Sequence, residues 1–472
     1  MEKRSVMLYV GATVVVAIAG AAVAMQPLIA ALVICAAGLL AVLARTDWWQ
    51  RAYGLTLVLM MGATSTIAPL VTVAEYGRYA AAAALLAVTW LTTRGIAPVI
   101  SGKLHQRALG ALWLTVALAA ASVLWSVDRI RSGLQVVALV MLVSLIHVLS
   151  TRRWTDRDRM LKDLKVGFYV LTGAFIACIA APFLGIPETR AFGGSEDTVG
   201  RFQGLFNNPN MLALLSAITI PLGWGHFRER PTVFRFVSVL PAVVTTFMAE
   251  SRTAIIAAAA AMLWVVLRSG AKTIARALYV LGLTAGIALV SNLNPLGTAL
   301  DRFGKIEGGD ILNTRGTAWE AAIRLVIEQP IGYGWQAGRS LFESLQGASD
   351  FEFSRTSVHN SYLQSLLELG FISLLPLAYL TFTMVVLAFR GSSRGMGAGL
   401  AGVIAAGLIV QVTESAMFGT GQAYPYIVWF AVAGGLASYK PRPGKHQHLS
   451  ALAVNHGEPP RAPRLEGPAN GG

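Results

Sequence analysis

Apolar stretches of membrane-spanning length, separated by short polar breaks, recur along most of this chain. A run of about 17–25 apolar residues matches a hydrocarbon layer of ~30 Å at 1.5 Å per residue. We expect about 12–14 transmembrane helices, because three of the runs are short. The predicted spans are 6–24, 27–44, 52–72, 78–92, 108–124, 132–149, 166–184, 209–225, 236–249, 253–268, 275–291, 371–389, 396–414 and 424–439. The fold class predicted is therefore all-α and polytopic.

One loop is long enough to need structure of its own. Residues 292–370 contain an amphipathic helix predicted over 317–330, with Thr317 and Glu320 at capping-box spacing and Pro330 as its stop. Glu320, Arg324 and Glu328 are expected to share one face of this helix. Such a helix would lie across the membrane surface or over a cavity.

A second helix is predicted in this loop by SVHNSYLQSLLELG, residues 357–370. Ser361 and Gln364 fit another capping box, and Gly370 ends the run. The segment 441–472 is rich in Pro, Gly and charge, which predicts a disordered tail. The domain prediction is one integral membrane domain, residues 1–440, followed by that tail.

Composition and charge agree with this pattern. The chain is 55% hydrophobic and 13% charged, whereas soluble domains carry about a quarter charged residues. Lys3, Arg4, the basic segment 151–165 and the tail fall on one side if the spans alternate, which predicts cytoplasmic termini. The net charge of +14 then reflects membrane topology and anionic lipids, and predicts no nucleic-acid partner.

A single histidine, His359, is predicted on the outward side; the other six lie in or beside cytoplasmic segments. His359 precedes a helix N-terminus, whose positive dipole end disfavours imidazolium, so we expect a neutral imidazole able to accept a proton. Asn360 is predicted to orient the ring or to bind a substrate hydroxyl. The alternative is that both residues only cap the helix.

Three further outward stretches carry polar groups. RFQGLFNNPN (201–210) ends as a span begins, ESR (250–252) joins two spans, and NTRGTAW (313–319) places Arg315 before the amphipathic helix. The earlier stretch LWSVDRIRS (124–132) is expected to be another outward turn, because it resembles an early outward turn of the family named next. Arginine at these places suits bidentate capture of phosphate or carboxylate, although a single interfacial arginine often only snorkels.

The order of these stretches resembles the O-antigen ligase and O-antigen polymerase superfamily of bacteria. The resemblance rests on Arg-x-x-Gly-x-Phe-x-Asn-Pro-Asn, then Ser-Arg-Thr-Ala, then Arg-x-x-x-Trp ahead of Pro-x-Gly-x-Gly, then His-Asn-x-Tyr-Leu. It covers roughly residues 110–439. It implies an inner-membrane glycosyltransferase acting on the periplasmic face, with a glycan donor carried on undecaprenyl pyrophosphate.

The resemblance also implies site residues. His359, Arg315 and Arg252 would be catalytic. The predicted substrate-binding residues are Arg201, Asn208, Asn210, Asn360 and Glu414. Glu414 is included because family ligases often carry an acidic residue in a late outward loop, although no surrounding motif secures the match.

We expect no metal and no cofactor. A glycosyl pyrophosphate has a good leaving group, whose charge arginines can neutralise. The Asp156 and Asp158 pair lies in the basic cytoplasmic segment, where charge pairing explains it, and Glu196 with Asp197 lacks a partner motif. Cys35 and Cys178 both lie within apolar runs and indicate no metal site.

Two choices remain open at the level of the sequence. A ligase passes the glycan to lipid A-core, whereas a polymerase passes it to another lipid-linked repeat unit; the long helical loop favours the ligase. A transporter would also be polytopic, but ionisable groups within the spans would then be expected, and the predicted spans contain few of them.

Overall fold

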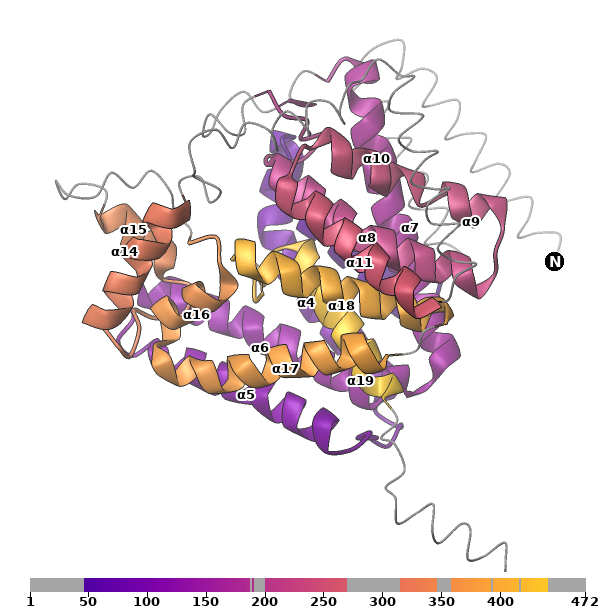
Figure 1. Ribbon diagram of the computed structural model, residues 1–472. Helices are drawn as coiled ribbons and strands as arrows, with labels where there is room; N and C mark the ends of the chain where they lie inside the picture. The colour runs from indigo at the N-terminus through magenta and orange to yellow at the C-terminus, as the bar shows by residue number, and fades with distance from the viewer. Residues whose placement is uncertain are drawn as a thin grey trace, which may run out of the picture. The chain divides into compact units, whose positions relative to one another are not determined.

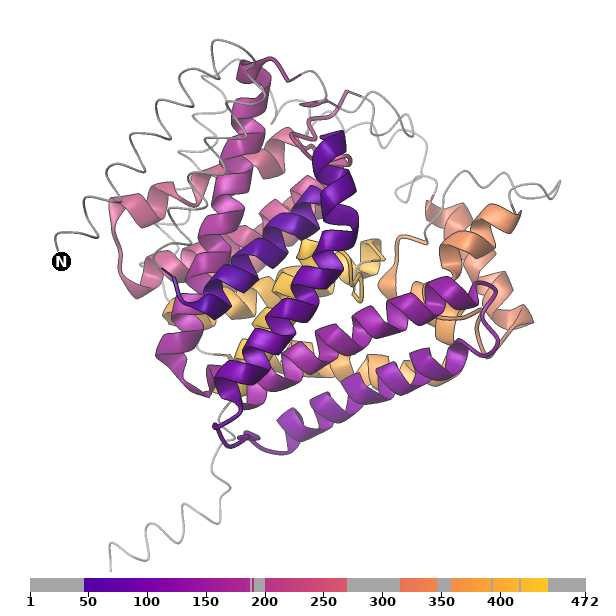
Figure 2. The same ribbon diagram turned by 180° about the vertical axis from the view of Figure 1, so that it is seen from behind.

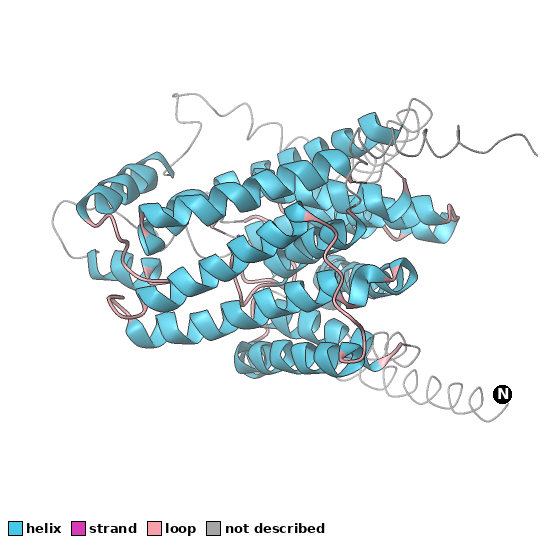
Figure 3. Cartoon of the chain, turned by 90° about the horizontal axis from the view of Figure 1, so that it is seen from below, coloured by secondary structure: helices cyan, strands magenta, loops and turns pink. Residues whose placement is uncertain are grey.

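The computed structural model describes residues 46–186, 189–190, 200–269, 315–345, 358–391, 394–415 and 417–439. Within these ranges every regular element is a helix (Figure 3), and pairing between extended segments is limited to two isolated bridges. The all-α prediction is confirmed. The predicted spans 6–24, 27–44 and 275–291 lie outside the described residues. Contacts divide the chain into residues 1–439 and 440–472, and the second unit also lies outside them.

The helix bounds follow the predicted spans closely in most places. In chain order the helices are α3 (Trp48–Gly62), α4 (Ala68–Thr93), α5 (Lys103–Ser122), α6 (Arg129–Thr151), η1 (Arg153–Thr155), α7 (Arg157–Ala180), η2 (Ala181–Leu184), α8 (Pro209–Glu229), α9 (Val233–Val237), α10 (Leu240–Met248), α11 (Arg252–Ser269), α14 (Arg315–Glu328), α15 (Gly338–Leu345), α16 (Ser361–Leu369), η4 (Phe371–Ser373), α17 (Leu374–Arg390), α18 (Gly395–Thr413) and α19 (Ala423–Ser438).

Four helical stretches of the described residues are long and apolar enough to cross a membrane. They are Arg129–Thr155, Arg157–Leu184, Phe371–Arg390 and Gly395–Thr413. Two shorter apolar stretches, Val233–Met248 and Ala423–Ser438, accompany them. The protein is thus an all-α polytopic membrane protein, and the total of 12–14 spans stays a prediction.

The predicted boundary between two early spans is wrong. The sequence pattern placed spans at 52–72 and 78–92, but the break between α3 and α4 lies at 63–67. Polar side chains and a proline set it there: Thr64 Oγ1 donates to the Met61 carbonyl, and Pro69 lies in the first turn of α4. The consequence is that Arg78, expected at the edge of a span, lies inside α4.

Helix α18 packs antiparallel to both α8 and α11, and the registers of the two pairs match. A Cβ on Gly402 of α18 would meet Pro221 of α8 at 2.6 Å and Val265 of α11 at 2.7 Å. Gly402 lies about 12 residues before Glu414, while the other two lie about 12–13 residues after the starts of their helices. At 1.5 Å per residue, the starts of α8 and α11 and the end of α18 reach the same level within a few ångströms. We call this the site end.

The loop helices α14, α15 and α16 lie together at the same end of α5, α6 and α17, as both opposite views show (Figures 1 and 2). The glycine-rich turn IGYGW (331–335) docks them there. Its Trp335 backbone N–H donates to Ser122 Oγ at 3.0 Å, and the Tyr333 carbonyl accepts from the Val127 N–H at 3.1 Å. The turn is therefore held between the α5–α6 connection and α16.

Glycine is required in that turn. Gly334 has φ +108°, and a Cβ there would lie 2.4 Å from the Cβ of Ser126. Gly332, at φ +81°, would place a Cβ 2.5 Å from the Glu368 carbonyl oxygen. The Pro-x-Gly-x-Gly pattern thus encodes a close backbone approach between the loop and the helical bundle.

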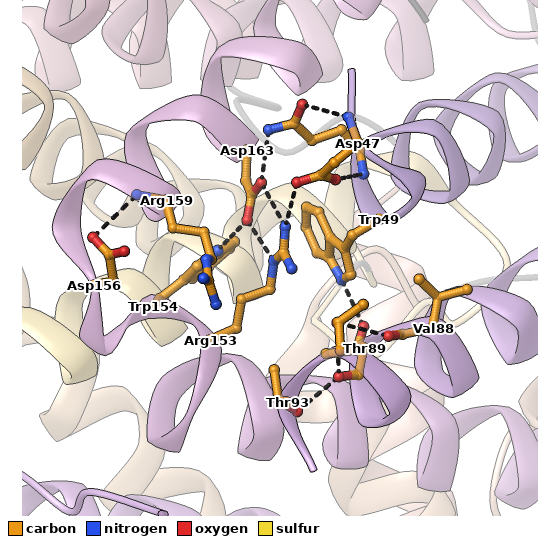
Figure 4. A network of polar contacts seen from close by, with 12 residues as sticks. Asp47, Trp49, Val88, Thr89, Thr93, Arg153, Trp154, Asp156, Arg159 and Asp163 are labelled. Carbon is orange, nitrogen blue, oxygen red and sulfur yellow. Dashed lines mark hydrogen bonds and ion pairs between the residues drawn. The ribbon is translucent and has the colours of Figure 1, made fainter. Parts of the chain in front are cut away.

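At the opposite end of the bundle lies an ionic network centred on the buried Asp163 carboxylate (Figure 4). The Asp163 carboxylate accepts from Arg153 Nε at 2.7 Å and from Trp154 Nε1 at 2.9 Å. Arg153 Nη2 and Gln50 Nε2 also donate to it, at 3.0 and 3.1 Å, and Arg153 reaches Asp47 at 3.5 Å. Asp163 and Arg153 are 0% and 3% exposed, so this pair ties α3, η1 and α7 together away from solvent.

Candidate functional site

His359 and Glu414, distant in sequence, meet at the site end. His359 Nδ1 lies 2.9 Å from Glu414 Oε2. The side chains are 26% and 12% exposed, so the imidazole is more accessible than the carboxylate. A carboxylate at Nδ1 favours the tautomer that carries its proton on Nδ1, which leaves Nε2 as the acceptor. The pair has the arrangement of a general base held by an orienting carboxylate.

The local backbone around His359 is built to make this contact. Asn360 is the N-cap of α16, and its Oδ1 accepts from the backbone N–H groups of Tyr362 and Leu363 at 3.0 Å each. Ser361 Oγ donates to the Glu414 carbonyl at 2.6 Å and accepts from the Met417 N–H at 3.0 Å. The start of α16 is thereby fixed to the residues that follow α18.

This geometry corrects the predicted capping boxes. The N-cap of α16 is Asn360, not Ser361, so the cap lies one residue earlier than predicted. The alternative reading of Asn360 as a cap is confirmed for its Oδ1. In the other loop helix, α14 begins at Arg315 rather than at a Thr317 cap. Glu320, Arg324 and Glu328 are all exposed, so their predicted common polar face is confirmed.

Arg201 is buried against backbone. Its guanidinium donates from Nε and Nη2 to the Ala249 carbonyl, at 3.0 and 2.7 Å, and from Nη2 to Asn210 Oδ1 at 2.8 Å. The side chain is 5% exposed. Because Ala249 opens the Glu-Ser-Arg turn, Arg201 holds the segment that leads directly into Arg252.

Asn208 and Asn210, both predicted to bind substrate, lie beside Arg201 at the start of α8. Asn208 is the N-cap of α8, and its Oδ1 accepts from the Asn210 N–H at 2.8 Å. The Asn210 side chain then bonds Arg201. The Asn-Pro-Asn motif therefore begins a helix and positions an arginine.

Arg252 is the first residue of α11 and is half-buried. Its side chain makes no hydrogen bond or ion pair to the described part of the chain, in contrast with Arg201. Arg315 is the first residue of α14, and its side chain lies outside what the structure describes. The predicted convergence of Arg315 on His359 therefore stays a prediction.

Backbone strain concentrates at the site end. Among the described residues, three non-glycine residues have positive φ: Glu250 at +51°, Gln336 at +54° and His359 at +52°. All three lie in connections at the site end. Such conformations are uncommon outside glycine and asparagine and cluster at functional sites, where surrounding contacts hold them.

One buried carboxyl near the site was not predicted. Glu368 on α16 is 2% exposed, and its carboxyl accepts from Gln364 Nε2 and from the backbone N–H groups of Gln336 and Gly338. Burial raises the pKa of Glu368 to about 7, against these hydrogen bonds and the charge of Arg131. The sequence signal was a glutamate among leucines on a short helix.

No cluster of three or more His, Cys, Asp or Glu side chains able to hold a metal is found among the described residues. Asp156 of the Asp-x-Asp pair is the N-cap of α7 and accepts from the backbone N–H groups of Asp158 and Arg159. Within the described residues its partners are thus helix N–H groups rather than the basic side chains predicted for it. Metal independence stays a prediction.

Residues 236–378 match the family model described as O-antigen ligase. The match runs from the end of α9 through the loop helices to the start of α17, and covers less than a third of the chain. It includes Arg252, Arg315 and His359 and confirms the resemblance to the O-antigen ligase superfamily. The comparison with curated proteins gives no match.

Proposed function

We propose, from the O-antigen ligase family segment at residues 236–378, that this protein is a membrane glycosyltransferase that moves a glycan from undecaprenyl pyrophosphate to a hydroxyl of lipid A-core. The observation that carries the proposal is the His359–Glu414 pair at the site end, 2.9 Å apart. A membrane protein without acid–base chemistry has little need of a strained, carboxylate-oriented imidazole at the end of its bundle.

The reaction is a displacement at the anomeric carbon of the donor. The acceptor hydroxyl oxygen forms the new bond to that carbon, and the bond to the pyrophosphate oxygen breaks from the opposite side, so the configuration inverts. The hydroxyl proton passes to His359 Nε2. Glu414 stabilises the imidazolium that results. Such a positioned base contributes typically ~10²–10⁴-fold.

The leaving pyrophosphate requires cations rather than an acid. Arg252 is suited to this because its guanidinium has no carboxylate partner in the described residues, and because its place at the start of α11 is level with Glu414. Arg315 is proposed as the second phosphate contact. Arg201 acts as a positioning residue for Arg252, with Asn208 and Asn210 supporting it.

The site end is proposed to face the periplasm of a bacterial inner membrane, with both termini cytoplasmic. The basic segment that contains Arg153 and Arg157 lies at the opposite end of the bundle, as the positive-inside rule requires for this orientation. A cysteine at residue 359 should react with a membrane-impermeant thiol reagent added from the periplasmic side. Labelling from the cytoplasm only would contradict this orientation.

A polymerase would use the same donor chemistry and differ only in the acceptor. Deleting the gene and separating the cell's glycolipids on a gel distinguishes the two. Core lipid without glycan, together with accumulated lipid-linked polymer, indicates a ligase. Core lipid with single repeat units indicates a polymerase. An unchanged glycolipid pattern would contradict both and favour a transporter or another substrate.

Metal independence is tested separately on the purified protein. Transfer from a lipid-linked glycan should persist after EDTA treatment and dialysis, because arginines rather than a cation neutralise the pyrophosphate. Loss of transfer that added Mg²⁺ or Mn²⁺ restores would overturn this part of the proposal.

A further inference from the structure

Arg78 is a cation within a membrane-associated helix that the proposed chemistry does not use. It lies ten residues after the start of α4, about 15 Å along the helix axis. Its side chain is half-buried. Glu75 lies one turn earlier on the same helix, yet no ion pair joins Arg78 to any carboxylate of the described residues.

One edge of the Arg78 guanidinium is occupied and the other is not. Nη1 donates to the Gly421 carbonyl at 3.0 Å. Nε is fully buried and has no hydrogen-bond partner. The edge formed by Nε and Nη2 is the one that grips a carboxylate or phosphate through two parallel hydrogen bonds. A buried, unsatisfied N–H on that edge is costly unless a ligand completes it.

The surrounding residues hold the guanidinium in place. Its Cζ lies 4.9 Å from the ring centroid of Tyr79. The Tyr79 hydroxyl accepts from Gln135 of α6 at 3.3 Å, and Gln135 accepts in turn from Thr420 Oγ1 at 2.8 Å. A Cβ on Gly421 would lie 3.0 Å from both Cζ and Nη1 of Arg78. The absence of a side chain at Gly421 is therefore part of the pocket for this arginine.

This cluster adjoins the His359–Glu414 pair through a single connection. Glu414 and Gly421 stand at the two ends of the segment between α18 and α19. Seven residues of extended chain span at most about 25 Å, so Arg78 lies within the length of a lipid-linked saccharide from the base. Of the anions that this edge can bind, phosphate is the one that the proposed donor and bilayer phospholipids have in common.

We propose that Arg78 binds a phosphate group of a lipid through its Nε–Nη2 edge. The inference rests on the proposed function for the identity of that lipid as a polyprenyl phosphate, whereas the phosphate site itself does not require transfer activity. The alternative source of the same chemistry is the headgroup of a bilayer phospholipid. Arg78 is thus a binding residue separate from Arg252 and Arg315.

The test measures lipid binding to the full-length protein in a phosphate-free detergent. The probes are undecaprenyl phosphate and phosphatidylglycerol, each compared with its phosphate-free counterpart, undecaprenol and diacylglycerol. We expect Arg78→Gln to weaken undecaprenyl phosphate binding about 10- to 100-fold, the usual effect of a lost charged hydrogen bond, and to leave undecaprenol binding unchanged. Arg94→Gln, an exposed arginine at the far end of α4, is the matched control and should bind as wild type.

Gly421→Ala provides a second variant that keeps the charge. Its Cβ should displace the guanidinium and weaken phosphate-lipid binding in the same direction. Preference for undecaprenyl phosphate over phosphatidylglycerol identifies the substrate lipid, and equal binding identifies a bilayer lipid; either supports the phosphate site. Wild-type affinity in both Arg78→Gln and Gly421→Ala would overturn it, as would equal binding of undecaprenol and undecaprenyl phosphate to wild type.

Failure of this inference can be told from failure of the proposed function. His359→Ala should bind undecaprenyl phosphate as tightly as wild type, because His359 does not contact the phosphate in the proposal. If the protein binds the lipid through Arg78 yet transfers no glycan, the phosphate site stands and the transferase proposal falls. If Arg78→Gln transfers glycan normally and binds the lipid with wild-type affinity, the phosphate site falls and the transferase proposal stands.

Discussion

The charged side chains at the two ends of the helical bundle differ in how they are paired. At one end, Arg153 and Asp163 are buried together, and each oxygen of the Asp163 carboxylate accepts hydrogen bonds from neighbouring donors (Figure 4). At the site end, Arg252 has no carboxylate partner in the described residues, and the 26%-exposed imidazole of His359 is oriented by Glu414 through Nδ1. A satisfied ion pair fastens helices, whereas unsatisfied charge leaves capacity for a substrate.

Backbone conformation also differs between the two ends of the bundle. The opposite end is built from regular helix termini with side-chain caps, such as Asp47 on α3 and Asp156 on α7. The site end holds the three non-glycine residues with positive φ in the described chain. The polar groups named at the first end therefore have structural explanations, whereas the strained His359 beside Glu414 points to a functional one.

The largest expected effect on activity comes from His359→Ala. We expect transfer to fall by ~10²–10⁴-fold, the contribution of a positioned base, while the Tm in detergent stays near that of wild type. The measurement is transfer of a lipid-linked glycan by purified protein. His147→Ala, on α6 toward the opposite end, is the control and should retain full activity. A fully active His359→Ala protein would contradict the proposal that the site end carries the catalytic base.

The largest expected effect on stability comes from Asp163→Asn. Removing one member of a buried pair leaves Arg153 with only the exposed Asp47 carboxylate at 3.5 Å, and the loss costs about 3–5 kcal/mol of unfolding free energy. Thermal unfolding in detergent should show a clear loss of Tm. Asp156→Asn is the matched control, because asparagine caps a helix as well as aspartate does, and its Tm should be nearly unchanged. Equal effects of the two substitutions would contradict the structural role.

Arg201→Lys separates positioning from substrate binding. Lysine keeps the charge but cannot reproduce the three hydrogen bonds to Ala249 and Asn210, so the Glu-Ser-Arg turn should loosen. We expect transfer to fall by roughly 10-fold, with faster amide exchange at residues 249–251. Arg190→Lys, on an exposed arginine, should change neither. Reduced transfer without faster exchange would indicate direct substrate contact instead.

A smaller, pH-dependent effect is expected from Glu368→Gln. The pKa of Glu368 is raised from the unfolded value to about 7, so the folded state holds its proton where the unfolded state has lost it. This stabilisation is complete at low pH and is lost as the pH rises through about 7. Between pH 5 and 8 the Tm of wild type should fall by roughly 2–4 °C more than that of the variant. Parallel pH profiles would contradict the assignment.

The helices were predictable because apolar runs of fixed length encode them. The bounds of α8, α11, α18 and α19 differ from the predicted spans by only a few residues. The α3–α4 break was misplaced because alanines and isolated polar residues around Ala68 continue the apolar pattern across a real turn. The short helix α15 was not predicted because its eight residues are fewer than the window of about 11–18 residues over which helical periodicity is judged.

The site was only partly predictable, because its geometry depends on contacts distant in sequence. The local sequence pattern predicted that His359 precedes a helix. The bond to Glu414, 55 residues later, was not. The motif predicted Arg201 to be a substrate contact, and only the structure reveals that the segment before α8 brings its guanidinium to the Ala249 carbonyl.

The central claim is that His359 and Glu414 act as one unit in transfer, and a double-mutant cycle tests it most directly. Transfer rates are measured for wild type, His359→Gln, Glu414→Gln and the double variant. Glu414→Gln alone should cost at least ~10-fold, because an amide no longer fixes the tautomer or stabilises imidazolium. We predict that the double variant is no slower than His359→Gln, since the carboxylate acts only through the ring. Losses that multiply independently would contradict the account.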